Sequence, residues 1–234
     1  ATPEFYLRAK EANPPQCIAK LLECFLYVRK VRLSSTLQLK LEKDLQLANA
    51  LYPFRQVKTH FYTLAAGLNS KSLDNISLGV LPQRVIFGFL DHQTYSGNIK
   101  KCSFSFQHFD CSYVDLLING MSQGKPYEIS FPKDDIALAK RPYLALFTNT
   151  GIYSETGNGI TYSGFVKDSF LLAYDLTADM CSNQYEHNNP QNHGDLSIQL
   201  KFSKTLPKPI SVMVYLEYAQ TVEIDRARNV IRYF

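Results

Sequence analysis

Two histidines stand six residues apart in a polar stretch, with acidic residues beside them. His187 and His193 lie near Glu186 and Asp195. Imidazole and carboxylate groups bind metals, but this spacing matches none of the common closed zinc sites. The stretch is rich in Asn and contains a proline, which is typical of an exposed loop. We therefore interpret residues 183–194 as a hydrophilic surface loop and predict no metal ion and no other cofactor.

A second cluster contains the residue types of a nucleophile and its base. Cys102, His108 and Cys111 lie close together in the sequence. A Cys–His pair needs a third group that orients the base, and the sequence identifies none. We interpret His108 as a partly buried histidine beside small core cysteines. The short stretch 157–159, Gly-Asn-Gly, lacks the Lys-Ser/Thr of a phosphate-binding loop and is read as a turn. These patterns predict a protein that is not an enzyme.

The densest run of charge lies near the C-terminus. Glu223, Asp225, Arg226 and Arg228 alternate in sign beside apolar residues. Paired carboxylates can perform acid–base chemistry, but carboxylates interleaved with guanidinium groups favour ion pairs. The pattern indicates a strand end whose ion pairs form within the chain or with a neighbouring molecule. These four residues are the candidate assembly contacts.

Composition excludes several classes of protein. The chain has 234 residues and a formal net charge of +4, and its basic residues are scattered in small groups rather than concentrated in an arm. Scattered charge predicts solvated faces and no specific nucleic-acid site. No stretch reaches the ~18 apolar residues of a membrane span, and the first residues lack the apolar core of a signal peptide. Five cysteines without a C-x-x-C pair favour synthesis in a reducing compartment, the cytoplasm or nucleus.

Strands must position these groups, because period-two alternation dominates the sequence. The aromatic fraction of 13% consists of Phe and Tyr, which favour strands. Residues 196–202 and 212–218 alternate most clearly, and the loop between them, which contains two prolines, predicts an antiparallel pair. Asn119-Gly120 is a good hairpin signal, although the return strand near 127–131 comes late. Further strands are predicted over residues 21–33, 57–65, 85–89, 102–106, 114–118, 170–176 and 230–234.

Two stretches have helical features. Leu37, Leu41 and Leu45 lie at helical spacing, Ser34 to Thr36 offer N-caps, and Pro53 is expected to stop the run. Within residues 134–148, Pro142 is expected to begin a short helix that ends at a Gly151 cap.

Eight to ten short strands at this spacing predict a β-sandwich. The predicted fold is all-β: an antiparallel, eight-stranded jelly roll with one or two short helices in its loops. No composition break justifies a second domain. We predict a single jelly-roll domain over residues 17–234, preceded by an N-terminal arm or linker over residues 1–16.

Several segments, in order and spacing, resemble the C-terminal jelly roll of the double-jelly-roll major capsid protein of Polinton (Maverick) elements and adintoviruses. The resemblance starts near Cys17 and covers more than nine-tenths of the chain. The most characteristic piece is residues 222–230, VEIDRARNV. The other segments that carry it are LYVRKV (26–31), LPQRV (81–85), FSFQHF (104–109), LLING (116–120), YLALFT (143–148), GNGI (157–160) and LAYDLT (172–177).

The resemblance implies a structural role in the virion, and no catalytic residues. In such proteins two eight-stranded sandwiches stand side by side, and three chains form a hexon-like, pseudo-hexameric capsomer that tiles an icosahedral shell. The expected partners are therefore other capsid subunits: an N-terminal jelly roll, which the given sequence lacks, and the neighbours in a trimeric capsomer. An isolated roll exposes a face that its partner normally covers, so the chain is expected to pair with another chain or to self-associate.

Two other functions remain open at this point. Jelly rolls also serve as lectins and receptor-binding domains, and Tyr and Asn in the loop 182–192 are suited to sugars. This alternative is a domesticated binding module that no longer forms capsids. A cupin-like enzyme needs inward-facing His and Glu metal ligands, and the five scattered histidines include no His-x-His pair.

Overall fold

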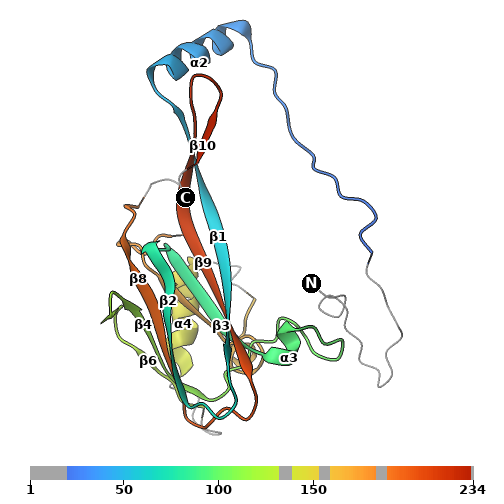
Figure 1. Ribbon diagram of the computed structural model, residues 1–234, viewed down its shortest axis with the longest axis vertical. Helices are drawn as coiled ribbons and strands as arrows, with labels where there is room; N and C mark the ends of the chain where they lie inside the picture. The colour runs from blue at the N-terminus through green and yellow to red at the C-terminus, as the bar shows by residue number, and fades with distance from the viewer. Residues whose placement is uncertain (1–19, 132–138, 153–158, 183–188, 233–234) are drawn as a thin grey trace. The chain divides into compact units, whose positions relative to one another are not determined.

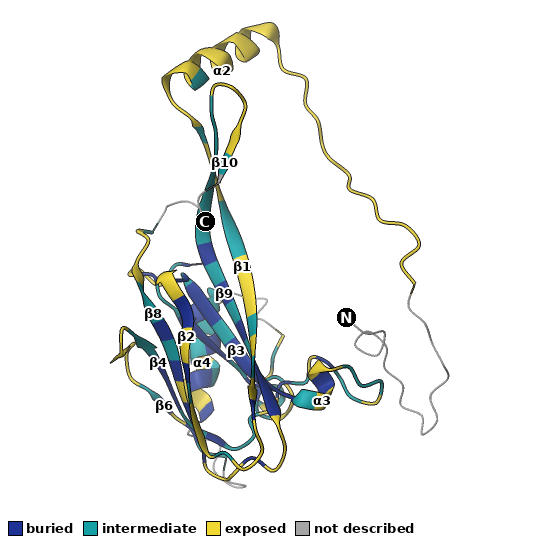
Figure 2. Ribbon diagram, in the orientation of Figure 1, coloured by how far each residue is buried: buried dark blue, intermediate teal, exposed yellow. Residues whose placement is uncertain are grey.

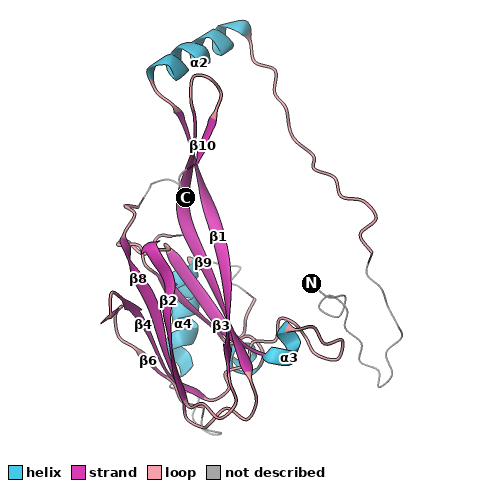
Figure 3. Ribbon diagram, viewed as in Figure 1, coloured by secondary structure: helices cyan, strands magenta, loops and turns pink. Residues whose placement is uncertain are grey.

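The computed structural model describes residues 20–131, 139–152, 159–182 and 189–232. These residues contain ten strands and four helices (Figures 1 and 3). The strands are β1 (Ala50–Leu64), β2 (Ser70–Val80), β3 (Arg84–Asp91), β4 (Cys111–Ile118), β5 (Met121–Ser122), β6 (Tyr127–Glu128), β7 (Leu171–Asp175), β8 (His193–Phe202), β9 (Ile210–Ile224) and β10 (Val230–Arg232). The helices are α2 (Ser35–Leu47), α3 (His92–Tyr95), α4 (Lys140–Thr150) and α5 (Tyr162–Lys167).

Contacts divide the described chain into two compact units. The sandwich unit comprises residues 57–218, and the ribbon unit comprises residues 20–56 together with 219–232. The strands β1 and β9 contribute residues to both units. The predicted arm over residues 1–16 lies outside the described residues.

The two sheets have the strand order of a jelly roll. One sheet has the order β1-β9-β3-β7, and the other has the order β2-β8-β4-β5, with β6 also paired to β4. The long strands therefore alternate between the sheets along the chain, and early strands lie beside late ones. The pairings among β2 to β10 whose register the structure describes are all antiparallel. This wrapping of an antiparallel ribbon into two facing sheets is the jelly-roll architecture, and the predicted fold class is confirmed.

The strand β3 lies at the centre of the core. It pairs with β9 on one side and with β7 on the other, from Arg84 opposite Glu217 and Asp175 onward. Nearly all of its residues are buried, which explains why its apolar run is almost continuous rather than strictly alternating. Phe87 and Phe89 are fully buried and contact further rings from β7 and β8.

Gly88 allows a loop to pass close to β3. A Cβ atom at this position would lie 2.7 Å from Cδ1 of Phe106 and 3.0 Å from the carbonyl oxygen of Phe170. Phe106 and Phe170 are joined by a backbone hydrogen bond of 3.0 Å. The loop before β4 therefore covers the sheet at a point where only glycine leaves enough room.

The pairing predicted for the two most regular strands is wrong. β8 pairs with β2 and β4, whereas β9 belongs to the other sheet and pairs with β1, β3 and β10. The loop through Pro207 and Pro209 thus crosses between the sheets instead of closing a hairpin. Alternation identifies which side chains of a strand are buried. It does not identify the sheet that the strand joins, because the strands of both sheets have one apolar, buried face.

Two predicted strands are absent from the described structure. Residues 20–34 contain no helix or strand, and residues 102–106 form turns with a single isolated bridge between Phe106 and Ser169. The β-rich composition of both stretches is real, but residues 20–34 pair with no described strand, and residues 102–106 contribute only this one bridge. The strand predicted over residues 57–65 begins earlier, at Ala50, so Pro53 lies inside an edge strand rather than stopping the preceding helix.

The turn and helix signals are confirmed more closely. Asn119 and Gly120 have φ values of 52° and 77° and join β4 to β5, as a type I′ hairpin turn requires. The predicted Gly151 cap follows the end of α4 at Thr150 and has a φ of 69°, although the helix begins at Lys140 rather than at Pro142. The helix α2 begins after Ser34, whose Oγ accepts a hydrogen bond from the Leu37 N–H. The short helices α3 and α5 were not predicted.

His108 lies against the aromatic part of the core. Its ring stacks on Phe131 with centroids 3.8 Å apart, and its Nδ1 accepts a hydrogen bond of 2.9 Å from the Asp110 N–H. Burial lowers the pKa of His108, and the nearby Lys204 lowers it further, although Asp110 acts in the opposite direction. The neutral ring is therefore the form that the folded protein favours.

This arrangement predicts a loss of stability in mild acid. The unfolded chain takes up a proton at His108 near pH 6.5, above the pKa in the folded protein, so stability is lost as the pH falls below about 6.5. His108→Asn, which retains an acceptor near the Nδ1 position, is expected to flatten this dependence between pH 7 and 5. One proton contributes at most about 1.4 kcal/mol per pH unit. Urea unfolding of both proteins across this range measures the difference, and parallel curves would contradict the prediction.

Candidate assembly surface

The ribbon unit has no buried core. It contains α2, the first part of β1, the end of β9 and β10. Every residue in it whose burial the structure describes is exposed or only partly buried (Figure 2). A stable folded unit of this size normally buries well over half of the surface that its chain exposes when unfolded. The unit therefore lacks the internal packing that would hold it in one conformation by itself.

Apolar side chains are concentrated on this unit. It carries more than half of the large apolar side chains that are exposed in the described part of the chain. The most exposed lie in the segment before α2, where Leu26 and Tyr27 are 89% and 92% exposed. The sandwich unit, by contrast, has a continuous core from both sheets. Large exposed apolar patches mark protein–protein or membrane contacts.

The helix α2 contributes an apolar stripe to the same unit. Leu37, Leu41 and Leu45 follow the helical repeat, and none of them is buried. The predicted helix is therefore confirmed, but its apolar side has no covering partner in the described residues. A helix of 13 residues is marginal in water without packing of its apolar face.

The four candidate assembly contacts lie on the hairpin between β9 and β10. Glu223 pairs with Ile231 near the end of β9, and its Oε2 accepts a hydrogen bond of 3.0 Å from Nδ2 of Asn49. Arg228 lies 4.0 Å from a carboxylate oxygen of Glu42 on α2. Asp225 and Arg226 line an open groove together with the last turn of α2. The structure thus places all four residues on the ribbon unit, and Glu223, Asp225 and Arg228 make contacts within it.

Asp225 organises the turn of this hairpin. Its carboxylate accepts hydrogen bonds from the backbone N–H of Asn229 at 2.8 Å and from the side-chain Nδ2 at 3.0 Å. These hydrogen bonds, the side-chain one first, lower the pKa of Asp225. Arg228 adopts a φ of 67° within the turn, which is uncommon for a residue other than glycine.

Asp225→Ala is expected to loosen the hairpin without unfolding the sandwich. The Asn229 N–H loses its acceptor, and the left-handed conformation at Arg228 loses its support. Backbone amides of β10, in particular Ile231 opposite Glu223, should exchange with solvent several-fold faster, while amides of β3 keep their protection. Arg226→Ala, at the next position of the turn, serves as the matched control. Equal protection of Ile231 in all three proteins would contradict this account.

The candidate catalytic and metal residues do not form a site in the described structure. Among residues 20–131, 139–152, 159–182 and 189–232, no group of three or more His, Cys, Asp or Glu side chains is placed to hold a metal ion. Glu186 and His187 lie outside these residues, and His193 begins β8. Cys111 is fully buried, and burial raises the pKa of its thiol to about 12, so it is a poor nucleophile. Cys102 is partly exposed.

No helix in the described part of the chain is long and apolar enough to cross a membrane. No protein-family model matches the sequence, and no curated protein matches it either. Solved structures do match. They are viral.

Three of the matching structures come from the Sputnik virophage, from PBCV-1 and from mavirus. A structure of the Sputnik virophage matches 80% of this chain and 39% of its own, with 14% identity and a TM-score of 0.48. VP54 of PBCV-1 matches 86% of this chain and 55% of its own, with 8% identity and a TM-score of 0.49. The mavirus major capsid protein matches 80% of this chain and 41% of its own, with 6% identity and a TM-score of 0.39. The chain therefore spans about two-fifths to just over half the length of these proteins.

The sequence did not reveal the exposed segment before α2. Its β-rich pattern predicts a strand. A strand inside a sheet of this chain and a strand that pairs with another molecule have the same pattern. The two kinds of strand differ only in the folded protein, by which strands pair in the sheets and by how exposed their side chains are.

Proposed function

We propose that this chain is a structural capsid protein, one jelly roll of a double-jelly-roll building block that assembles into an icosahedral shell. It acts through contacts with other subunits and performs no chemical reaction. Its place is the virion, and its partners are an N-terminal jelly roll and the neighbours within a trimeric capsomer. Three features support this: the jelly-roll topology, the ordered sequence resemblance to Polinton and adintovirus capsid proteins, and the ribbon unit.

The ribbon unit is the observation that carries the proposal. A folded sandwich with its own core is joined to a unit that has exposed apolar residues and no buried ones. Burial against another subunit would give that unit the packing it lacks. Subunit interfaces of obligate assemblies are similarly more apolar than ordinary surfaces.

The test compares matched substitutions on the two units. Leu37→Glu with Leu41→Glu changes the stripe of α2, and Leu78→Glu with Leu144→Glu changes residues of the sandwich unit that are 77% and 62% exposed. All four side chains are exposed, so both variants should fold like the unchanged protein, which circular dichroism verifies. Light scattering after size exclusion should show self-association at high micromolar concentration that only the α2 variant loses. Electron microscopy with a co-expressed N-terminal jelly roll should show capsomers. A protein that stays monomeric and forms no capsomers would contradict the proposal.

A further inference from the structure

The segment before α2 has the features of a strand without a sheet. Residues 21–31 are here called the arm; they differ from the N-terminal arm that was predicted over residues 1–16. They contain seven large apolar side chains that are each 65–92% exposed: Leu21, Leu22, Phe25, Leu26, Tyr27, Val28 and Val31. No hydrogen bond between backbone groups joins the arm to another described residue. An extended chain with unpaired backbone groups and apolar side chains is a template for pairing with another strand.

The arm presents two different faces when it is extended. Successive side chains point to opposite sides, so Leu22, Cys24, Leu26 and Val28 share one side. Phe25 and Tyr27 share the other, and their ring centroids are 6.5 Å apart. Both sides are apolar near the middle of the arm, which suits a strand that is covered on both faces.

One acidic and one basic residue of the arm can pair across two copies. In an antiparallel pair with its two-fold axis at Leu26, Glu23 of each arm stands opposite Arg29 of the other. The same register sets Phe25 opposite Tyr27. Cross-strand pairs of opposite charge and of aromatic rings both stabilise antiparallel strands, and a two-fold axis repeats each pair on both sides.

We propose that the arm pairs in an antiparallel manner with the arm of a second copy of this chain, about a two-fold axis at Leu26. The proposal rests on the assembly role proposed above and names the partner that the arm contacts. Seven apolar side chains of this size offer an area on the order of the ~800 Å² that each partner contributes to a stable interface. A two-stranded ribbon alone is marginally stable. The apolar stripe of α2 on the same unit is available to cover one face of it.

A charge exchange tests the pairing and its register. Glu23→Arg places two arginines opposite each other, and Arg29→Glu places two glutamates opposite each other. Each single variant is expected to weaken self-association at least about fivefold, because both symmetric pairs change from attraction to repulsion. The double variant restores opposite charges and should return the dissociation constant to within about threefold of the original. Sedimentation of the full chain over a concentration series measures all four proteins.

A crosslink locates the axis independently. In a Cys24→Ser background, Leu26→Cys should give a covalent dimer on oxidation, because residue 26 faces its own counterpart. Lys30→Cys, which faces Leu22 in this register, is the matched control and should crosslink far less. Both positions are exposed, so neither change should disturb the fold.

The outcomes separate this proposal from the proposed function. An unchanged chain that stays monomeric, single charge variants that associate normally, or a double variant that fails to recover would each overturn the arm pairing. If the α2 variant loses capsomers while the arm variants keep them, the capsid role stands and the arm pairing fails. If arm-dependent dimers form but no larger assembly appears with the N-terminal roll, the arm pairing stands and the capsid role fails.

Discussion

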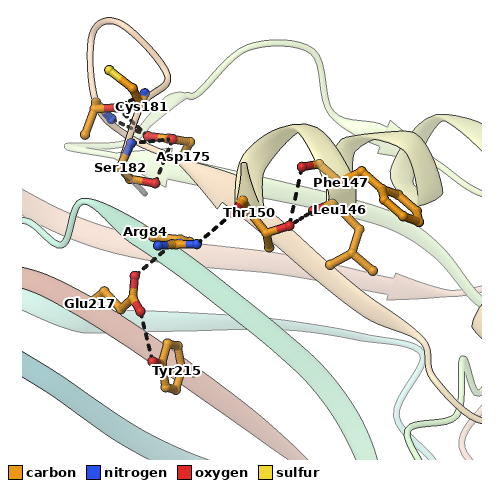
Figure 4. A network of polar contacts seen from close by, with 10 residues as sticks. Arg84, Leu146, Phe147, Thr150, Asp175, Cys181, Ser182, Tyr215 and Glu217 are labelled. Carbon is orange, nitrogen blue, oxygen red and sulfur yellow. Dashed lines mark hydrogen bonds and ion pairs between the residues drawn. The ribbon is translucent and has the colours of Figure 1, made fainter. Parts of the chain in front are cut away.

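Replacing Arg84 by methionine is expected to lower the free energy of unfolding by about 3–5 kcal/mol. Arg84 opens β3 in the middle of its sheet, and its Nε lies 2.7 Å from Oε2 of Glu217 on β9 (Figure 4). Both side chains are nearly inaccessible, at 9% and 14% exposure. Methionine removes the cation and leaves the carboxylate of Glu217 buried without its charge partner.

The loss would extend to the neighbouring helix. Nη1 of Arg84 donates a hydrogen bond of 3.2 Å to the carbonyl oxygen of Thr150 in the last turn of α4. The other oxygen of Glu217 accepts one of 2.9 Å from the Tyr215 hydroxyl. The single ion pair thus connects β3, β9 and the end of α4 (Figure 4). Helix ends leave carbonyl groups without partners, so this contact has no ready replacement.

A double variant distinguishes an unpaired charge from lost packing. Arg84→Met with Glu217→Leu removes both charges, and it is expected to recover most of the stability, because an apolar pair of similar volume often replaces a buried ion pair at little cost. Urea unfolding measures the midpoint and the slope, and an unchanged slope shows that only stability has changed. A single variant that loses less than about 1 kcal/mol would show that the ion pair is solvated rather than buried.

Sequence pattern predicts the faces of strands better than their partners. The strands β3, β7, β8 and β9 were all located from their apolar patterns, because such patterns report which side chains are buried. The jelly roll, however, depends on long-range pairing between strands far apart in the chain, such as β1 with β9. The hairpin predicted between β8 and β9 is wrong for this reason. The Asn119-Gly120 turn is different, because the backbone conformation that this dipeptide favours predicts that the two strands beside it pair with each other.

The candidate site was predicted in part. The charged run at residues 223–228 was recognised from its composition and lies on the ribbon unit as a turn between two strands. Its neighbours in space, Glu42 and Asn49, were not predictable, because their contacts depend on the fold of α2 against the hairpin. The role of these charges in assembly stays a prediction.

Phe170→Ala is expected to be as damaging as the loss of Arg84, with a decrease of about 3–5 kcal/mol in the free energy of unfolding. Phe170 is fully buried just before β7. Its ring lies 5.1 Å from that of Phe165, 5.7 Å from that of Phe131 and 6.1 Å from that of Phe89, measured between centroids. These rings come from α5, from the stretch after β6 and from β3, so truncation leaves a cavity between separate elements.

The size of the loss depends on whether those elements can close the cavity. The backbone of Phe170 is fixed by its hydrogen bond to Phe106, and Gly88 already holds the neighbouring strand as close as it can approach. The site should therefore relax little, which places the expected loss at the upper end of the range. Phe170→Leu retains most of the volume and is expected to lose less than about 1.5 kcal/mol. The ribbon unit has no part in this core. Phe170→Ala should therefore weaken self-association only under conditions in which the sandwich itself unfolds. A variant that loses self-association while its unfolding curve is unchanged would contradict the separation of the two units.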